Sequence, residues 1–112
     1  MSYGFGRLND LAAQINRNAH AKGFHEYKPT FGNSGQDTRH ILSWLMLVTT
    51  EVAEAAEAVR KGDKVNFVEE LADICIRVFD IAEELGVNLE QEIVNKIVKN
   101  ESRAIKHGGK LA

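Results

Sequence analysis

The chain has 112 residues, of which 14 are Lys or Arg and 16 are Asp or Glu, so its formal net charge is -2. With 44% hydrophobic residues, one Pro and one Cys, the composition excludes collagen-like, disulfide-stabilised and low-complexity classes and predicts a single domain over residues 1–112. The lone cysteine cannot form an intramolecular disulfide, and the chain has neither a signal sequence nor an apolar stretch of about 20 residues, so we expect a cytoplasmic protein that binds no membrane. The near-neutral charge also argues against a general nucleic-acid-binding protein.

Four segments have apolar residues at helical spacing, and no segment alternates as a strand does, so the sequence predicts an all-α, four-helix-bundle-like protomer. The predicted helices are residues 7–22, a second from Asp37 or Thr38 to Lys61, a third from Lys64 or Asn66 to Leu85, and a fourth from Asn88 towards Ala104.

The boundaries follow from capping residues. Gly23, Gly62 and Gly86 are placed to end the first three helices. We expect Asp37 or Thr38 to cap the second helix, and Asn66 with Glu69 to form a capping box at the third. The segment 23–37 holds the only proline and three aromatic residues, which predicts a long aromatic loop.

The second and third helices have long apolar stripes for so small a protein. Four helices in about 110 residues form only a small core, so we expect part of these stripes to be buried between subunits of a homo-oligomer, a dimer or tetramer. Cys75 lies in the stripe of the third helix, which predicts a buried, unreactive thiol.

Two pairs of acids border these stripes. Glu51 and Glu54 are three residues apart, as are Glu70 and Asp73, so each pair lies on one helical face. At about 100° per residue, both pairs lie beside their apolar stripe and on the same rotational side. If the two helices pack as an antiparallel hairpin, the pairs converge on one cleft.

Four converging carboxylates require a counter-charge. A set of oxygen ligands without Cys or His at ligand spacing favours Mg²⁺, with Mn²⁺ as the second choice, and such an ion takes phosphate oxygens as further ligands. The charge pattern agrees with this, since the segment from Glu51 to Asp73 has a balance of -4 and the segment from Lys96 to the end has +4. The alternative is that both segments are simply solvated helix faces.

The acids and their surroundings resemble those of the all-α nucleoside triphosphate pyrophosphohydrolases, the MazG-like superfamily. The motifs that carry the resemblance are Glu51-x-x-Glu54, Glu70-x-x-Asp73 after fifteen intervening residues, and Lys96-x-x-x-Asn100-x-x-Arg103. The resemblance covers residues 38–110.

This resemblance implies an oligomeric helical protein that hydrolyses a (d)NTP to the (d)NMP and pyrophosphate with Mg²⁺, for example in cleaning of the nucleotide pool. It implies that Glu51, Glu54, Glu70 and Asp73 are the metal ligands and the catalytic centre. It further implies that Lys96 and Arg103 neutralise phosphate oxygens and that Asn100 binds phosphate or sugar.

Three further residues are candidates for substrate binding, each with a structural alternative. Arg77 lies one turn beyond Asp73 and either contacts phosphate or forms an ion pair with that acid. Phe24 can stack on a base or anchor its loop, and Trp44 can stack on a base or belong to the core.

Two other functions remain open at this point. The first is a dUTPase or phosphoribosyl-ATP pyrophosphohydrolase of the same superfamily, which shares the metal chemistry and differs in its pocket. The second is a non-catalytic helical oligomerisation or regulatory module, which would bind no stoichiometric Mg²⁺.

Overall fold

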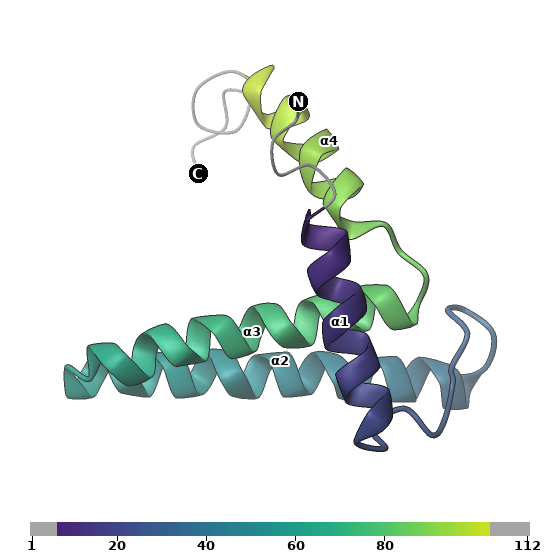
Figure 1. Ribbon diagram of the computed structural model, residues 1–112, viewed down its shortest axis with the longest axis horizontal. Coiled ribbons are helices and arrows are strands. Elements are labelled where there is room, and N and C mark those ends of the chain that lie inside the picture. The colour runs from purple at the N-terminus through teal and green to yellow at the C-terminus, as the bar shows by residue number, and fades with distance from the viewer. Residues whose placement is uncertain (1–6, 104–112) are drawn as a thin grey trace.

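The structure is a computed structural model that describes residues 7–103. It contains four helices, α1 (Arg7–Ala21), α2 (Gly35–Lys61), α3 (Lys64–Glu84) and α4 (Leu89–Glu101), and within those residues it has no strand (Figure 1). The predicted all-α class and the four predicted helices are therefore confirmed. The proposed contact of Ala104 with the core lies outside the described residues.

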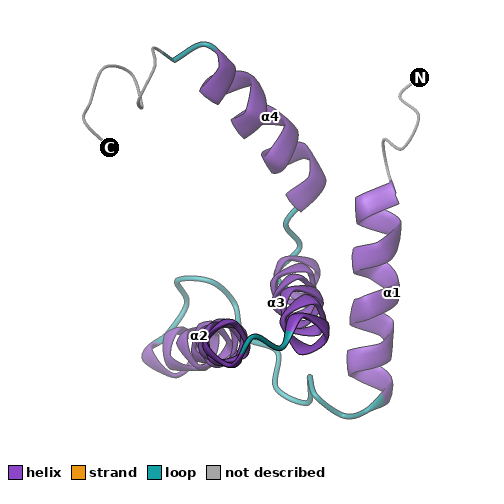
Figure 2. Ribbon diagram, turned by 90° about the vertical axis from the view of Figure 1, so that its left-hand side faces the viewer, coloured by secondary structure: helices purple, strands orange, loops and turns teal. Residues whose placement is uncertain are grey.

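Helices α2 and α3 form a long antiparallel hairpin. The turn is made by Gly62, whose φ of 70° lies in the left-handed region, and by Asp63, whose backbone N–H donates to the Ala58 carbonyl at 2.9 Å. Helix α1 crosses α3 on the side away from α2, and α4 leads away from the end of α3 (Figures 1 and 2). The hairpin brings the middle of α2 against the first half of α3, which is where the acid pairs lie.

The N-terminus of α2 differs from the prediction. Ser34 is the N-cap, and its hydroxyl accepts a hydrogen bond from the Asp37 N–H at 3.1 Å. Asp37 is buried inside the first turn, where its carboxylate accepts from the Tyr27 hydroxyl, from the Thr30 N–H at 2.9 Å and from Asn33 Nδ2 at 3.0 Å. The prediction that Asp37 or Thr38 caps the helix was wrong because the side chain of Asp37 bonds to the aromatic loop instead.

The predicted cap of α3 was also wrong. Asp63 is the N-cap, and its carboxylate accepts from the Asn66 N–H at 3.0 Å, so Asn66 and Glu69 form no capping box. The predicted start of the fourth helix is confirmed, because Asn88 is the N-cap of α4 and its side chain accepts from the Gln91 N–H at 3.1 Å.

A polar cluster around Glu84 fastens α1 and the aromatic loop to α3. Glu84 is 5% exposed and accepts from Asn16 Nδ2 at 3.0 Å and from Lys28 Nζ at 3.2 Å, while His20 Nε2 lies 2.7 Å from its Oε1. Burial by itself would raise the pKa of Glu84, but the hydrogen bonds from Asn16, Lys28 and His20 outweigh it and lower the pKa to about 2.

The hydrophobic core of the protomer is small. Among the described residues, six apolar residues are buried, namely Ala12, Ile41, Trp44, Ala55, Ala58 and Ala82. None of the large side chains in the described part of the chain is fully buried. Much of the predicted stripes is exposed instead, including Val52, Val59 and Leu71. Cys75 is exposed as well, so the prediction of a buried thiol was wrong for this protomer.

None of the described helices is long and apolar enough to span a membrane.

Candidate metal centre

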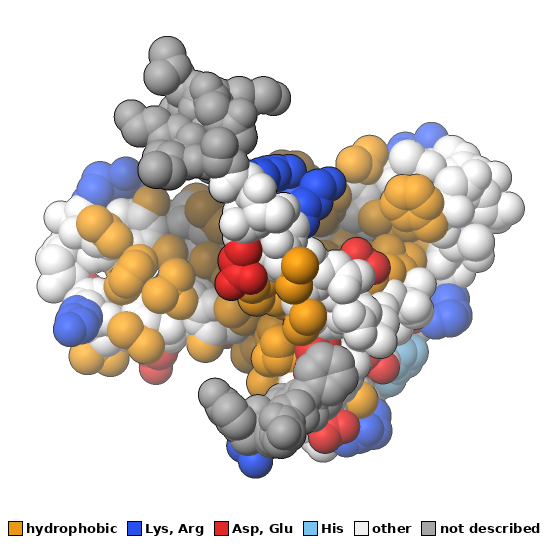
Figure 3. Space-filling model, turned by 90° about the horizontal axis from the view of Figure 1, so that it is seen from above, with side chains coloured by type: hydrophobic (Ala, Val, Ile, Leu, Met, Phe, Trp, Pro, Cys, Tyr) orange, Lys and Arg blue, Asp and Glu red, His pale blue; other side chains and the backbone are white. Residues whose placement is uncertain are grey.

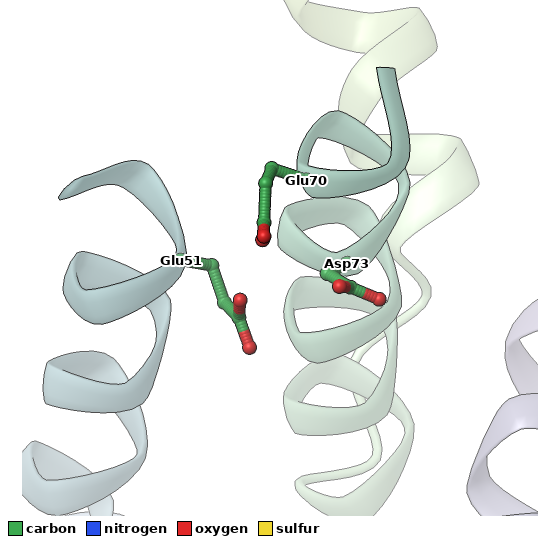
Figure 4. A group of neighbouring side chains, drawn as sticks. All are labelled: Glu51, Glu70 and Asp73. Atoms are coloured by element: carbon green, nitrogen blue, oxygen red, sulfur yellow. The ribbon is translucent and has the colours of Figure 1, made fainter. Parts of the chain in front are cut away.

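The acids of α2 and α3 meet in the middle of the hairpin. One carboxylate oxygen each from Glu51, Glu70 and Asp73 lie within 4.8 Å of one another (Figure 4). Glu51 comes from α2, and the other two come from α3. The side chains of Glu51 and Glu70 point into the space between the two helices (Figure 4). The expectation that an antiparallel hairpin makes the acids converge is therefore met by three of the four.

Glu54 lies one turn further along α2, outside this group of three. Its side chain is exposed, but it is close enough for its charge to raise the pKa of Glu70 and for a hydrogen bond with it to lower the pKa of Glu51. Glu54 therefore belongs to the same electrostatic cluster and lies at its solvent side.

Glu70 has the most perturbed environment of the three. Burial is the largest cause that raises its pKa to about 7, followed by its hydrogen bond with Glu51 and by the negative charges of Glu54, Glu51 and Asp73. It is 9% exposed, and its Oε1 has no hydrogen-bond partner among residues 7–103. A buried carboxylate oxygen without a partner, among other carboxylates, is an electron-pair donor available to a cation.

Within residues 7–103, Arg77 is the one cationic side chain that forms an ion pair with these acids. Its Nε donates to Glu51 Oε2 at 2.7 Å across the two helices, and this bond is the largest cause that holds the pKa of Glu51 below its usual value. The ion pair with Asp73 that the sequence also allowed is not the one formed. Arg77 thus partly neutralises the cluster without reaching Glu70.

A cavity of about 420 Å³ opens beside the acids. Two of the acids, Glu51 and Asp73, line one part of it together with Arg77. The rest is lined by α1, by the residues that follow it and by the next turns of α3, namely Ile15, Asn18, Ala19, Lys22, Phe24, Ile76 and Asp80. The volume lies in the range of small-molecule sites, and the lining combines an apolar wall with a few charged groups.

The two aromatic candidates occupy different places. Phe24 lines the cavity and is 68% exposed, so it is placed to contact a ligand there. Trp44 is 8% exposed and does not line the cavity; its ring lies edge-on to the rings of His25 and His40 at 5.4 and 5.3 Å. The geometry of Trp44 corresponds to the core role that the sequence also allowed.

The basic candidates of the C-terminal motif lie elsewhere. Lys96 and Asn100 are exposed on α4, and Arg103 follows its end. Helix α4 is held to α1 at its beginning, where the Asn9 N–H donates to Glu90 at 3.0 Å, and then leads away from the hairpin (Figure 2). The structure of one protomer therefore does not bring Lys96, Asn100 and Arg103 to the acids.

Asn18 of α1 and Lys22, which follows the end of α1, were not identified from the sequence, because both lie in a predicted helix with ordinary amphipathic spacing. Asp80 was not among the predicted site residues either, although it lines the cavity. Its spacing of seven residues from Asp73 was a usable signal, since residues two turns apart share one helical face.

Comparison with known proteins adds one finding. The model of the MazG-like family matches residues 46–112, which include both acid pairs, whereas α1 and the aromatic loop lie outside the match. No curated protein and no solved structure matches the chain. Because the matched residues make up more than half of the sequence, this chain belongs to the MazG-like family.

Proposed function

We propose that the protein is a metal-dependent nucleotide pyrophosphohydrolase that converts a (d)NTP to the (d)NMP and pyrophosphate. Membership of the MazG-like family supports a pyrophosphohydrolase-type activity. The observation that carries the proposal is the group formed by Glu51, Glu70 and Asp73, whose oxygens lie within 4.8 Å of one another, next to a cavity of about 420 Å³.

The residues present fit a hard divalent cation, Mg²⁺ or Mn²⁺. All donors in the group are carboxylate oxygens, and the buried Oε1 of Glu70 is without a hydrogen-bond partner among the described residues. Glu51, Glu70 and Asp73 would hold the ion, with Glu54 at the solvent side. When bound, the ion supplies positive charge that stabilises the phosphate chain and activates water for attack on phosphorus.

Arg77 provides a positive charge beside the metal ligands. Only its Nε bonds to Glu51 within the described residues, so the terminal guanidinium nitrogens remain to donate to phosphate oxygens in the cavity. The planar guanidinium thereby orients the phosphate chain along the acids. The apolar residues Ile15, Ala19 and Phe24 form the wall against which the nucleoside can pack.

The decisive experiment is a pyrophosphate-release assay over the common NTPs and dNTPs, dUTP and several oxidised nucleotides, with Mg²⁺ and with EDTA. We expect metal-dependent release of pyrophosphate with the monophosphate as co-product. Glu70→Gln should abolish it, and Glu69→Gln, at the neighbouring exposed acid of α3, is the matched control that should retain it. Activity that persists in EDTA or in Glu70→Gln would contradict the proposal.

The same assay addresses the alternatives. A dUTPase or a phosphoribosyl-ATP pyrophosphohydrolase would share the metal dependence but act only on its own substrate. A non-catalytic helical module would release no pyrophosphate. It would also lack the stoichiometric binding of Mg²⁺ or Mn²⁺ that an enzyme shows and that Glu54→Gln removes.

The surface of the hairpin supports a homo-oligomer as part of this proposal. Apolar side chains are exposed along both of its helices, among them Val59 at 61%, Val65 at 74% and Leu71 at 45%, and they gather over the hairpin in Figure 3. The radius of gyration is 16.6 Å, whereas a compact chain of this length has about 13 Å. A second copy would cover these faces, since a protomer in which no large side chain of the described residues is fully buried has little to stabilise it alone.

Sedimentation equilibrium measures this directly. We expect the purified protein to be a dimer or tetramer, and Val59→Glu to shift it towards the monomer. A monomer at all concentrations, with an intact helical circular dichroism spectrum, would contradict the oligomer.

A further inference from the structure

The cavity is lined by two polar residues that the proposed chemistry does not use. Asp80 lines it from α3 and Asn18 lines it from α1, and Phe24, which follows α1, lines the same cavity. Asp73 and Asp80 are seven residues apart on one face of α3, which corresponds to about 10 Å along the helix axis. If the phosphates bind at Asp73, the nucleoside extends towards Asp80.

Asp80 is held rigidly from behind. Its Oδ1 accepts from Asn16 Nδ2 at 2.9 Å, and its Oδ2 accepts from His25 Nε2 at 2.7 Å. The side chain of His25 is only 3% exposed, and neither Asn16 nor His25 lines the cavity. An ionised carboxylate has about four acceptor sites, so two donors on the far side leave further sites for a donor in the cavity.

His25 positions Asp80 at a cost. Its Nε2 donates to Asp80, and within the described residues its buried Nδ1 has no hydrogen-bond partner. The contact with His25 orients the carboxylate of Asp80, whose side chain retains 18% exposure.

Asn18 offers the complementary group. Its Oδ1 accepts from Gln14 Nε2 at 3.0 Å, which leaves the two hydrogens on Nδ2 to donate into the cavity. Asp80 therefore offers the cavity a hydrogen-bond acceptor and Asn18 offers it a donor, and the exposed ring of Phe24 lines the same cavity.

We infer that Asp80 and Asn18 select nucleotides whose base carries an exocyclic amino group next to a ring nitrogen acceptor, as cytosine and adenine do. The amino group donates to Asp80, the ring nitrogen accepts from Asn18, and Phe24 stacks on the base. A carbonyl oxygen in place of the amino group would face the carboxylate of Asp80 without a hydrogen between them. The inference rests on the proposed function, because it places the phosphates at the acids.

Two substrate pairs test it, dCTP against dUTP and ATP against ITP, since the second member of each pair has a carbonyl oxygen in place of the amino group and an N–H in place of the ring acceptor. We expect kcat/KM to favour the amino-bearing member on the order of tenfold to a hundredfold. Asp80→Asn replaces acceptor-only character with a donor, so it should remove or reverse the preference. Asp10→Asn, the same change at an exposed position of α1 outside the cavity, should leave it unchanged.

A second variant and a binding measurement keep the test independent of folding and of turnover. Asn18 is exposed and bonds only within α1 in the described part of the chain, so Asn18→Ala should fold and should lower kcat/KM for dCTP much more than for dUTP. Calorimetry should show that wild type, but not Asp80→Asn, binds dCMP more tightly than dUMP.

Equal kcat/KM within both substrate pairs in wild type, or an Asp80→Asn variant with the wild-type preference, would overturn the inference while the proposed function stands. If no triphosphate releases pyrophosphate, the proposed function fails instead. The difference between dCMP and dUMP binding then decides the inference on its own.

Discussion

Binding of Mg²⁺ or Mn²⁺ should displace a proton from Glu70. The pKa of this carboxyl is raised to about 7 by burial, by its hydrogen bond with Glu51 and by the neighbouring charges. A carboxyl must be ionised to ligate a cation, so the protein releases whatever fraction of a proton Glu70 holds before binding. Glu51 contributes none near neutral pH, because its pKa is lowered by Arg77.

The size of the release follows from the pKa of about 7. Glu70 is protonated to about 0.9 at pH 6, about 0.5 at pH 7 and about 0.1 at pH 8. Titration calorimetry in buffers with different ionisation enthalpies measures the number of protons released per ion at each pH. We expect that number to follow these fractions in wild type and in the control variant Glu69→Gln.

Stability in EDTA gives a second measurement that needs no metal binding. Because the folded pKa of Glu70 lies above the ordinary value of 4.5, the folded state binds the proton more tightly than the unfolded state. The contribution of Glu70 to stability is therefore complete below about pH 4.5 and is lost as the pH rises through 7. Glu70→Gln should remove this decline. A constant proton release between pH 6 and 8, together with identical stability profiles for wild type and Glu70→Gln, would refute the reasoning.

Other predictions address the fold and the site. Glu84 has a pKa of about 2, below its ordinary 4.5, so its contribution to stability is present above pH 4.5 and is lost as the pH falls towards 2. The temperature of thermal unfolding should therefore decline less steeply between pH 5 and 2.5 in Glu84→Gln than in wild type, and equal slopes would contradict this. Asp63→Ala removes the cap of α3 and should cost about 1 kcal/mol in urea unfolding, more than Asn66→Ala, whose backbone N–H remains; an equal cost would restore the capping role of Asn66. Asp73→Asn should lower turnover by orders of magnitude with an unchanged helical spectrum, and full activity would remove Asp73 from the metal centre.

The N-cap of α2 could not be predicted from the local sequence alone. Ser34, Asp37 and Thr38 are all residue types that cap helices, and propensity does not choose among them. The choice was made by Tyr27, Thr30 and Asn33, which bond to Asp37 and so tie the aromatic loop to α2.

The candidate site shows the same division. The spacing of the two acid pairs and their place beside the apolar stripes predicted convergence if the two helices form a hairpin, and three of the four acids, Glu51, Glu70 and Asp73, do meet. The partner of Arg77 was not predictable, because Asp73 and Glu51 were both within reach of its long side chain and only the packing of α2 against α3 selected Glu51.

By itself, the sequence determined that the protein has four helices and that an acidic centre lies on the middle two, because helical periodicity and motif spacing are local properties. The tertiary structure decided what surrounds that centre. It brought α1 across α3, so that Asn18 faces the same cavity as Asp80, and it directed α4 away from the acids. These contacts join residues that are far apart in the chain, and the angle at which two helices cross depends on side chains that no local pattern encodes.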